Sequence, residues 1–180
     1  MTPAQTAVHR QPSSFSTADA ITLVRIPLAI AFPLVTSVPV RLAILGVAAA
    51  TDLGDGWVAR RFGGSHIGAV LDPIADKLFV TVAFAVVWAS GQLTWFEVVG
   101  VLARDIIATV AFVITIITGK ATAVPARLGG KAVTLLQMVT LVLFVLQLNL
   151  VRRFAWATAA VALYAIYDYH QPFFRKLKTR

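Results

Sequence analysis

The sequence predicts an all-α membrane protein, a bundle of six transmembrane helices in one domain. Three observations lead to this fold class. Hydrophobic residues make up 58% of the 180-residue chain and the mean hydropathy is +0.81. Charged residues make up only 13%, whereas soluble domains carry about a quarter. The apolar residues also fall into six stretches, each near the roughly 20 residues that a helix needs to cross a bilayer.

The six predicted helices follow one another with short turns between them. Residues 1–16 are polar and predict a disordered cytoplasmic tail without the apolar core of a secretory signal. Residues 17–172 form the membrane domain, and residues 173–180 form a basic cytoplasmic tail. Turn signals such as Ser37-Val38-Pro39 and Gly63-Gly64-Ser65 separate the helices. The predicted spans are residues 19–36, 39–60, 66–89, 93–118, 130–149 and 153–169.

The basic residues predict the orientation of the bundle. The net charge is +8, and most of the basic residues lie in the tails and loops on one side of the predicted bundle. Such an excess is expected on the cytoplasmic side, so both termini are predicted to be cytoplasmic. We therefore expect an inner, plasma or organellar membrane location rather than a nucleic-acid partner. The chain has no cysteine, which excludes disulfides and thiolate metal sites. The residues assigned to the cytoplasmic side are Arg10, Arg60, Arg61, Lys120, Arg127, Lys131, Arg175, Lys176, Lys178 and Arg180, against Arg41, Arg152 and Arg153 outside.

Four of the eight acidic residues lie within one stretch of 25 residues, which marks the candidate site. Asp52 and Asp55 have i, i+3 spacing on the second predicted helix, and Asp72 and Asp76 have i, i+4 spacing on the third. If these helices are antiparallel neighbours, both pairs lie near the cytoplasmic surface. Carboxylates in a membrane are costly unless a cation offsets them. An all-oxygen set favours Mg²⁺ or Mn²⁺ over Zn²⁺.

Three other interpretations of the carboxylates remain at this point. They could be structural and pair with nearby Arg60, Arg61 or Lys77. They could serve a cation-coupled transporter, although such a pathway would spread carboxylates through the depth of the bundle. The chain could also be a non-enzymatic scaffold, which leaves the cluster unexplained. Metal-dependent release of CMP from CDP-diacylglycerol would separate an enzyme from the last two.

The motif resembles the signature of the CDP-alcohol phosphotransferases, D-x-x-D-G-x-x-A-R followed by G-x-x-x-D-x-x-x-D. The matching stretches are Asp52-Leu-Gly-Asp55-Gly56-Trp-Val-Ala59-Arg60 and Gly68-Ala-Val-Leu-Asp72-Pro-Ile-Ala-Asp76. The resemblance implies a six-helix membrane enzyme, expected to be a homodimer, that transfers a phosphatidyl group from CDP-diacylglycerol to an alcohol and releases CMP. It also implies that Asp52, Asp55 and Asp72 bind two Mg²⁺ or Mn²⁺ ions. Asp76 would be the catalytic base and could also contact metal.

The same resemblance suggests where the two substrates bind. Gly56, Ala59 and Gly68 would shape the cytidine pocket and Arg60 would contact the diphosphate. Further stretches resemble phosphatidylglycerophosphate and cardiolipin synthases: Leu71-Asp-Pro-Ile-Ala-Asp-Lys77, Gly130-Lys131-Ala-Val-Thr134-Leu-Leu-Gln137, and the amphipathic lead-in Thr22-Leu-Val-Arg25. In that lead-in, Asp19 replaces the usual Asn.

The remaining basic residues predict a pocket for the acceptor. Arg104, Arg127 and Lys131 could bind a phosphate on the acceptor alcohol. Alternatively, Arg104 could pair with Asp105 or with a motif Asp, and Arg127 and Lys131 could simply mark the cytoplasmic side. Glycerol 3-phosphate and phosphatidylglycerol both carry a phosphate, so this pocket does not separate them. We expect glycerol 3-phosphate as the acceptor, with phosphatidylglycerol or inositol phosphate as alternatives.

Overall fold

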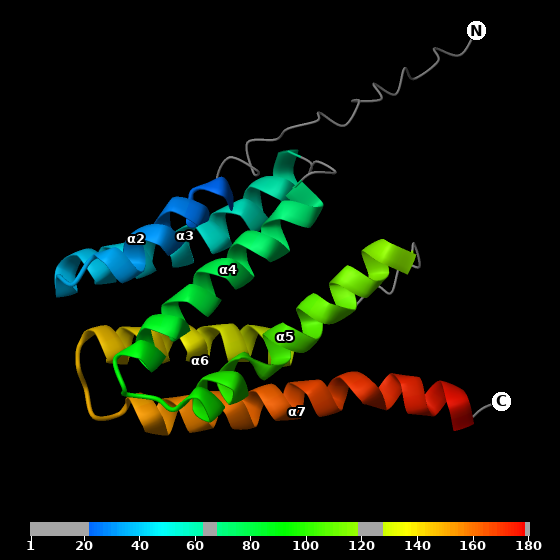
Figure 1. Cartoon of the computed structure of the whole chain (residues 1–180). Helices are drawn as coiled ribbons and strands as arrows, with labels where there is room; N and C mark the ends of the chain where they lie inside the picture. The colour runs from blue at the N-terminus through cyan, green and yellow to red at the C-terminus, as the bar shows by residue number, and fades with distance from the viewer. Residues whose placement is uncertain (1–21, 63–67, 119–127, 179–180) are drawn as a thin grey trace, which may run out of the picture.

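The computed structural model describes residues 22–62, 68–118 and 128–178, and these consist of helices and short connections without a strand. The side chains of residues 53, 55–62, 68–73, 116, 128 and 168–178 lie outside the description. The prediction of an all-α chain is confirmed, and its helices follow the predicted order (Figure 1). The helices are α2 (Arg25–Leu34), α3 (Val38–Phe62), α4 (Gly68–Ala89), α5 (Trp95–Thr118), α6 (Leu128–Val145) and α7 (Val151–Lys178).

The helix boundaries follow local sequence signals. Pro39 lies in the first turn of α3, where its missing N–H costs no helical hydrogen bond. Gly91 ends the turn after α4 with φ of 76°, a conformation that glycine adopts without strain. Thr94 and Glu97 form a capping box at the start of α5, since the Glu97 carboxylate accepts from the Thr94 N–H at 2.8 Å.

Two differences from the predicted segments concern the first and last helices. The segment predicted over residues 19–36 is represented by α2, which has 10 residues and ends at Leu34 before extended backbone at Val35. The last helix does not end at residue 169 but continues to Lys178, so most of the predicted basic tail is helical. Among the described helices, α5 meets the length and apolarity criterion for a membrane span, over Trp95–Thr115.

The helices pack into two groups that share one apolar core. Helix α2 contacts both α3 and α4, while α7 contacts α5 and α6. Helix α6 joins the groups through contacts with α3 and α4 (Figure 1). In the described region, α4 therefore packs mainly against α2, and α3 packs against α6 and α2, so the predicted second and third spans make little contact with each other.

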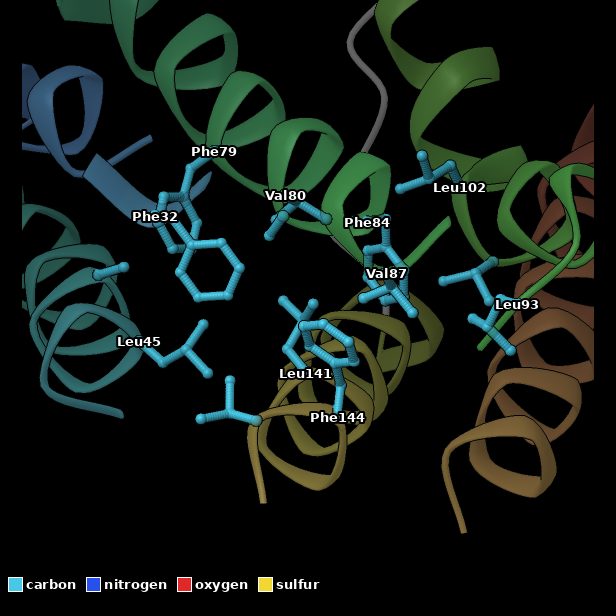
Figure 2. Close-up of a cluster of buried hydrophobic side chains, with 14 of the residues drawn as sticks. Phe32, Leu45, Phe79, Val80, Phe84, Val87, Leu93, Leu102, Leu141 and Phe144 are labelled. Carbon is cyan, nitrogen blue, oxygen red and sulfur yellow. The ribbon is translucent and has the colours of Figure 1, made fainter. Parts of the chain in front are cut away.

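Large buried side chains from several helices fill the space between the groups. Phe32 of α2 packs edge-on against Phe79 of α4, with ring centroids 6.1 Å apart. Leu141 and Phe144 of α6 point toward the same core from the opposite side (Figure 2). Burying such side chains fixes the relative positions of α2, α4 and α6, and with them the polar residues near the ends of these helices.

Candidate active site

The first carboxylate of the motif pairs with a buried arginine from another helix. Arg25, at the start of α2, is 2% exposed, and its Nη2 lies 3.5 Å from Asp52 Oδ1 on α3. Its Nε donates to Thr51 Oγ1 at 3.4 Å. Asp52 itself remains 42% exposed. Arg25 therefore joins this carboxylate to α2, and the Asp52 side chain stays partly exposed to solvent.

The last carboxylate of the motif lies beside a lysine that bridges two helices. Asp76 and Lys77 are neighbours near the start of α4, and Lys77 Nζ lies 3.6 Å from Asp76 Oδ2. The same ammonium donates a hydrogen bond to Asp105 Oδ1 on α5. Lys77 thus lies between the Asp76 carboxylate and a second carboxylate that the sequence motif does not contain.

Asp105 is the centre of a buried polar network. Arg104 Nη1 lies 3.2 Å from Asp105 Oδ1, and Gln137 of α6 donates through Nε2 to Asp105 Oδ2 at 2.6 Å. The Gln137 amide also donates to the Val101 carbonyl at 3.1 Å. Since Asp105 and Gln137 are both buried, these hydrogen bonds replace the water that the two groups lose on folding. The network fixes α4, α5 and α6 against one another next to Asp76.

The predicted acceptor residues are only partly brought together. Arg104 lies against the start of α6, because a Cβ added at Gly130 would come within 2.4 Å of Arg104 Nη2. Lys131, the next residue on α6, is exposed. Arg127 lies outside the described residues. Arg104 both pairs with Asp105, one of the two roles the sequence allowed, and lies beside the position of Lys131.

The backbone of the remaining motif residues is helical, as predicted, while their side chains lie outside the description. These residues are Asp55, Gly56, Ala59 and Arg60 in α3, and Gly68 and Asp72 in α4. Among the side chains that the structure does describe, no group of three or more potential metal ligands occurs. The two described motif carboxylates, Asp52 and Asp76, have the all-oxygen chemistry of a Mg²⁺ or Mn²⁺ site.

Two residues of this region, Arg25 and Gln137, had no role assigned from sequence and were identified only as parts of stretches that resemble known synthases. Lys77 was assigned only as a possible ion-pair partner of the motif carboxylates, and its Nζ lies 3.6 Å from Asp76 Oδ2. A buried cation could have been suspected at Arg25, since it is flanked by apolar residues within a predicted span. The convergence of Lys77 and Gln137 on Asp105 is not visible in the sequence, because it depends on how three helices pack.

The helical fold thus gathers carboxylates and cations next to an apolar core, a composition suited to lipid substrates that carry phosphate. Residues 15–166 match the family model for CDP-alcohol phosphatidyltransferase, and the chain belongs to that family of enzymes. The predicted family is therefore confirmed. The matched range contains all four motif carboxylates as well as Arg25, Asp105 and Gln137.

Curated relatives share a substantial part of the sequence. A probable phosphatidylglycerophosphate synthase of Mycobacterium tuberculosis is 39% identical over 108 residues, which cover 59% of this chain and 50% of the relative. A CDP-diacylglycerol–glycerol-3-phosphate 3-phosphatidyltransferase of Escherichia coli K12 is 35% identical over 136 residues, which cover 71% of this chain and 75% of the relative. The chain thus matches about half the length of the mycobacterial relatives and three quarters of the E. coli one.

Proposed function

We propose that this protein transfers the phosphatidyl group of CDP-diacylglycerol to glycerol 3-phosphate and releases CMP, with Mg²⁺ or Mn²⁺ as the cofactor. The observation that carries this proposal is the family match over residues 15–166, which contains Asp52, Asp55, Asp72 and Asp76. The names of the M. tuberculosis and E. coli relatives support the choice of acceptor.

The reaction is a displacement at phosphorus. The acceptor hydroxyl oxygen forms a bond to the phosphatidyl phosphorus, and the bond from that phosphorus to the CMP oxygen breaks. CMP leaves with the electron pair of this bond, and the hydroxyl proton passes to the Asp76 carboxylate. The bound divalent ions would neutralise the negative charge of the diphosphate. Asp52, Asp55 and Asp72 would hold these ions, and Asp76 could contact them.

The assignment of the substrate pockets rests on the motif residues and on the basic residues near α6. Gly56, Ala59 and Gly68 would leave room for the cytidine, and Arg60 would bind the diphosphate. Arg104, Lys131 and Arg127 would bind the acceptor phosphate, since guanidinium and ammonium groups form charge-assisted hydrogen bonds with phosphate oxygens. The position of Arg104 beside Gly130 supports this assignment, because it places a cation next to Lys131 at the start of α6.

We further propose that the six helices form a multi-pass membrane domain with the carboxylates on the cytoplasmic side. At 1.5 Å per residue, helices α3, α4, α5 and α7 are all longer than about 30 Å, the thickness of a hydrocarbon core. Apolar side chains also cover much of the outer surface: Phe96, Ile114, Ile117, Leu135 and Leu163 are more than half exposed. Such a surface suits contact with lipid tails. The homodimer remains a prediction.

A purified sample in detergent micelles tests the proposed function. CDP-diacylglycerol is offered together with glycerol 3-phosphate, phosphatidylglycerol, inositol phosphate or no acceptor, and released CMP is measured with Mg²⁺, with Mn²⁺ and with EDTA. We expect release that requires metal and is fastest with glycerol 3-phosphate. Fastest release with phosphatidylglycerol would make the protein a cardiolipin synthase. No release with any acceptor, with cation uptake into vesicles instead, would favour a transporter.

A further inference from the structure

We infer that Asp105 is a positioning residue that holds the Lys77 ammonium away from Asp76 and so keeps this carboxylate available for the reaction. The inference rests on the proposed function for the role of Asp76, but it concerns a contact that lies outside the family motif. Asp105 belongs to α5, whereas the four motif carboxylates belong to α3 and α4.

The geometry places Lys77 between two carboxylates that compete for it. Its Nζ is hydrogen bonded to Asp105 Oδ1 and lies 3.6 Å from Asp76 Oδ2. The second distance is beyond a normal charge-assisted hydrogen bond, which spans about 2.7–2.9 Å. The ammonium is therefore hydrogen bonded to Asp105 and forms only a longer ion pair with Asp76. Lys77 is 21% exposed and Asp105 is buried, so water screens this competition only partly.

Asp105 is held in place independently of Lys77. Gln137 donates to its Oδ2 at 2.6 Å, and Arg104 Nη1 lies 3.2 Å from its Oδ1. Gln137 is in turn fixed by the Val101 carbonyl. The position of the Lys77 ammonium is consequently set by α5 and α6, two helices that carry none of the motif carboxylates.

The consequence of losing Asp105 follows from the flexibility of a lysine side chain. Without the Asp105 charge, a small rotation would bring the Lys77 ammonium into direct hydrogen bonding with Asp76. A carboxylate paired in this way is a poorer acceptor for the hydroxyl proton and a poorer ligand for a cation. Removing Lys77 as well would free Asp76 again. The structure thus predicts that a second mutation repairs the first.

The test compares Asp105→Asn, Lys77→Met and the double variant. Asparagine keeps the size of Asp105 and a carbonyl for Gln137, while in Lys77→Met the Asp105 charge keeps Arg104 and Gln137 as partners. For Asp105→Asn we expect kcat to fall about ten-fold or more, the effect of one charge-assisted hydrogen bond on the base. The kcat of Lys77→Met should fall less, and the kcat of the double variant should be higher than that of Asp105→Asn. The KM for CDP-diacylglycerol should stay within about two-fold.

Mn²⁺ binding, followed by electron paramagnetic resonance on the purified protein, is the readout that does not depend on turnover. We expect weaker Mn²⁺ binding in Asp105→Asn and recovery in the double variant. Matched controls are Glu97→Gln, Arg152→Met and their double variant, which alter an ion pair between α5 and α7. These should change neither kcat nor Mn²⁺ binding.

Several outcomes would overturn the inference. A double variant as impaired as Asp105→Asn, or more so, would show that the network only supports packing or that Lys77 binds substrate. Wild-type kcat in Asp105→Asn would also overturn it. If the wild-type protein transfers to no acceptor but binds Mn²⁺, the proposed function fails, and the order of Mn²⁺ affinities among the variants still decides the inference. If the wild-type protein binds no Mn²⁺, both fail.

Discussion

Two carboxylates on α5, the buried Asp105 and the partly buried Glu97, both accept several hydrogen bonds but differ in what their partners contact. Glu97 accepts from Thr94, from the Trp156 indole at 3.1 Å and from Arg152, whose Nε lies at 3.0 Å. Asp105 accepts from Lys77, Arg104 and Gln137. Each carboxylate is almost fully removed from solvent, with exposed side-chain fractions of 8% and 6%.

The partners of Glu97 and those of Asp105 contact different parts of the molecule. The partners of Glu97 complete a helix cap and join α5 to α7, and Arg152 is 58% exposed. The cluster therefore has an explanation in helix capping and packing alone. The cations on Asp105 are mostly buried, and one of them lies beside Asp76. The same residue chemistry can thus serve the fold at one end of a helix and adjoin a reaction site two turns away.

We expect the largest effects at the motif carboxylates rather than at Asp105 or Glu97. Asp52→Asn, Asp55→Asn or Asp72→Asn should each reduce metal-dependent CMP release at least about 100-fold, since charge neutralisation by bound metal is worth several kcal/mol. Asp76→Asn should retain CDP-diacylglycerol binding and lose turnover, with Mn²⁺ binding weakened to about the same extent as in Asp105→Asn. The measurements are initial rates over a Mn²⁺ titration, with thermal unfolding to confirm that each variant is folded. Near-normal turnover in two of the first three would refute the metal assignment.

A smaller effect is expected at Gly130, the contact point of Arg104. In Gly130→Ala the new Cβ would come within 2.4 Å of Arg104 Nη2 and displace the guanidinium without removing its charge. We expect the KM for glycerol 3-phosphate to rise about three- to ten-fold, part of the value of a charge-assisted hydrogen bond. The KM for CDP-diacylglycerol should change little. Arg104→Ala and Lys131→Ala should act in the same direction.

Gly46→Ala is the matched control for this prediction. A Cβ at Gly46 of α3 would meet nothing within 4 Å, and alanine favours a helix by about 1 kcal/mol over glycine. This variant should keep both KM values and unfold no more easily than the wild type. If Gly130→Ala instead lowered the melting temperature and left the KM for the acceptor unchanged, the contact with Arg104 would be structural.

The two carboxylates on α5 also show how far the sequence could be interpreted. The capping box Thr94-Trp-Phe-Glu97 is a local pattern, and the helical order followed from apolar stretches and turn residues. The motif carboxylates stood out because charge is scarce in this chain. Partners from distant helices were a different matter, as Lys77 and Gln137 meet at Asp105 through contacts 28 and 32 residues apart in sequence. Such meetings depend on helix rotation, which a single sequence does not encode locally.

The loss of the helix cap should affect stability rather than turnover. Glu97→Ala removes the acceptor for the Thr94 N–H and for the Trp156 indole. We expect a loss of about 1–3 kcal/mol in unfolding free energy, from the cap and one orphaned hydrogen bond. Thermal unfolding followed by tryptophan fluorescence should show a lower melting temperature at unchanged kcat. A specific loss of turnover without loss of stability would mean that Glu97 and its partners also influence the site.

The smallest expected effect is at Arg152, and it tests the comparison most directly. Arg152→Met removes the ion pair with Glu97, but Thr94 and Trp156 still satisfy the carboxylate. Because Arg152 is 58% exposed, its ion pair should contribute no more than about 1 kcal/mol, as exposed pairs usually do. The melting temperature should therefore fall only slightly, and added salt should reduce the difference further. A loss as large as that of Glu97→Ala would show that this pair is effectively buried, for example in a membrane interface, and would remove the contrast between Glu97 and Asp105.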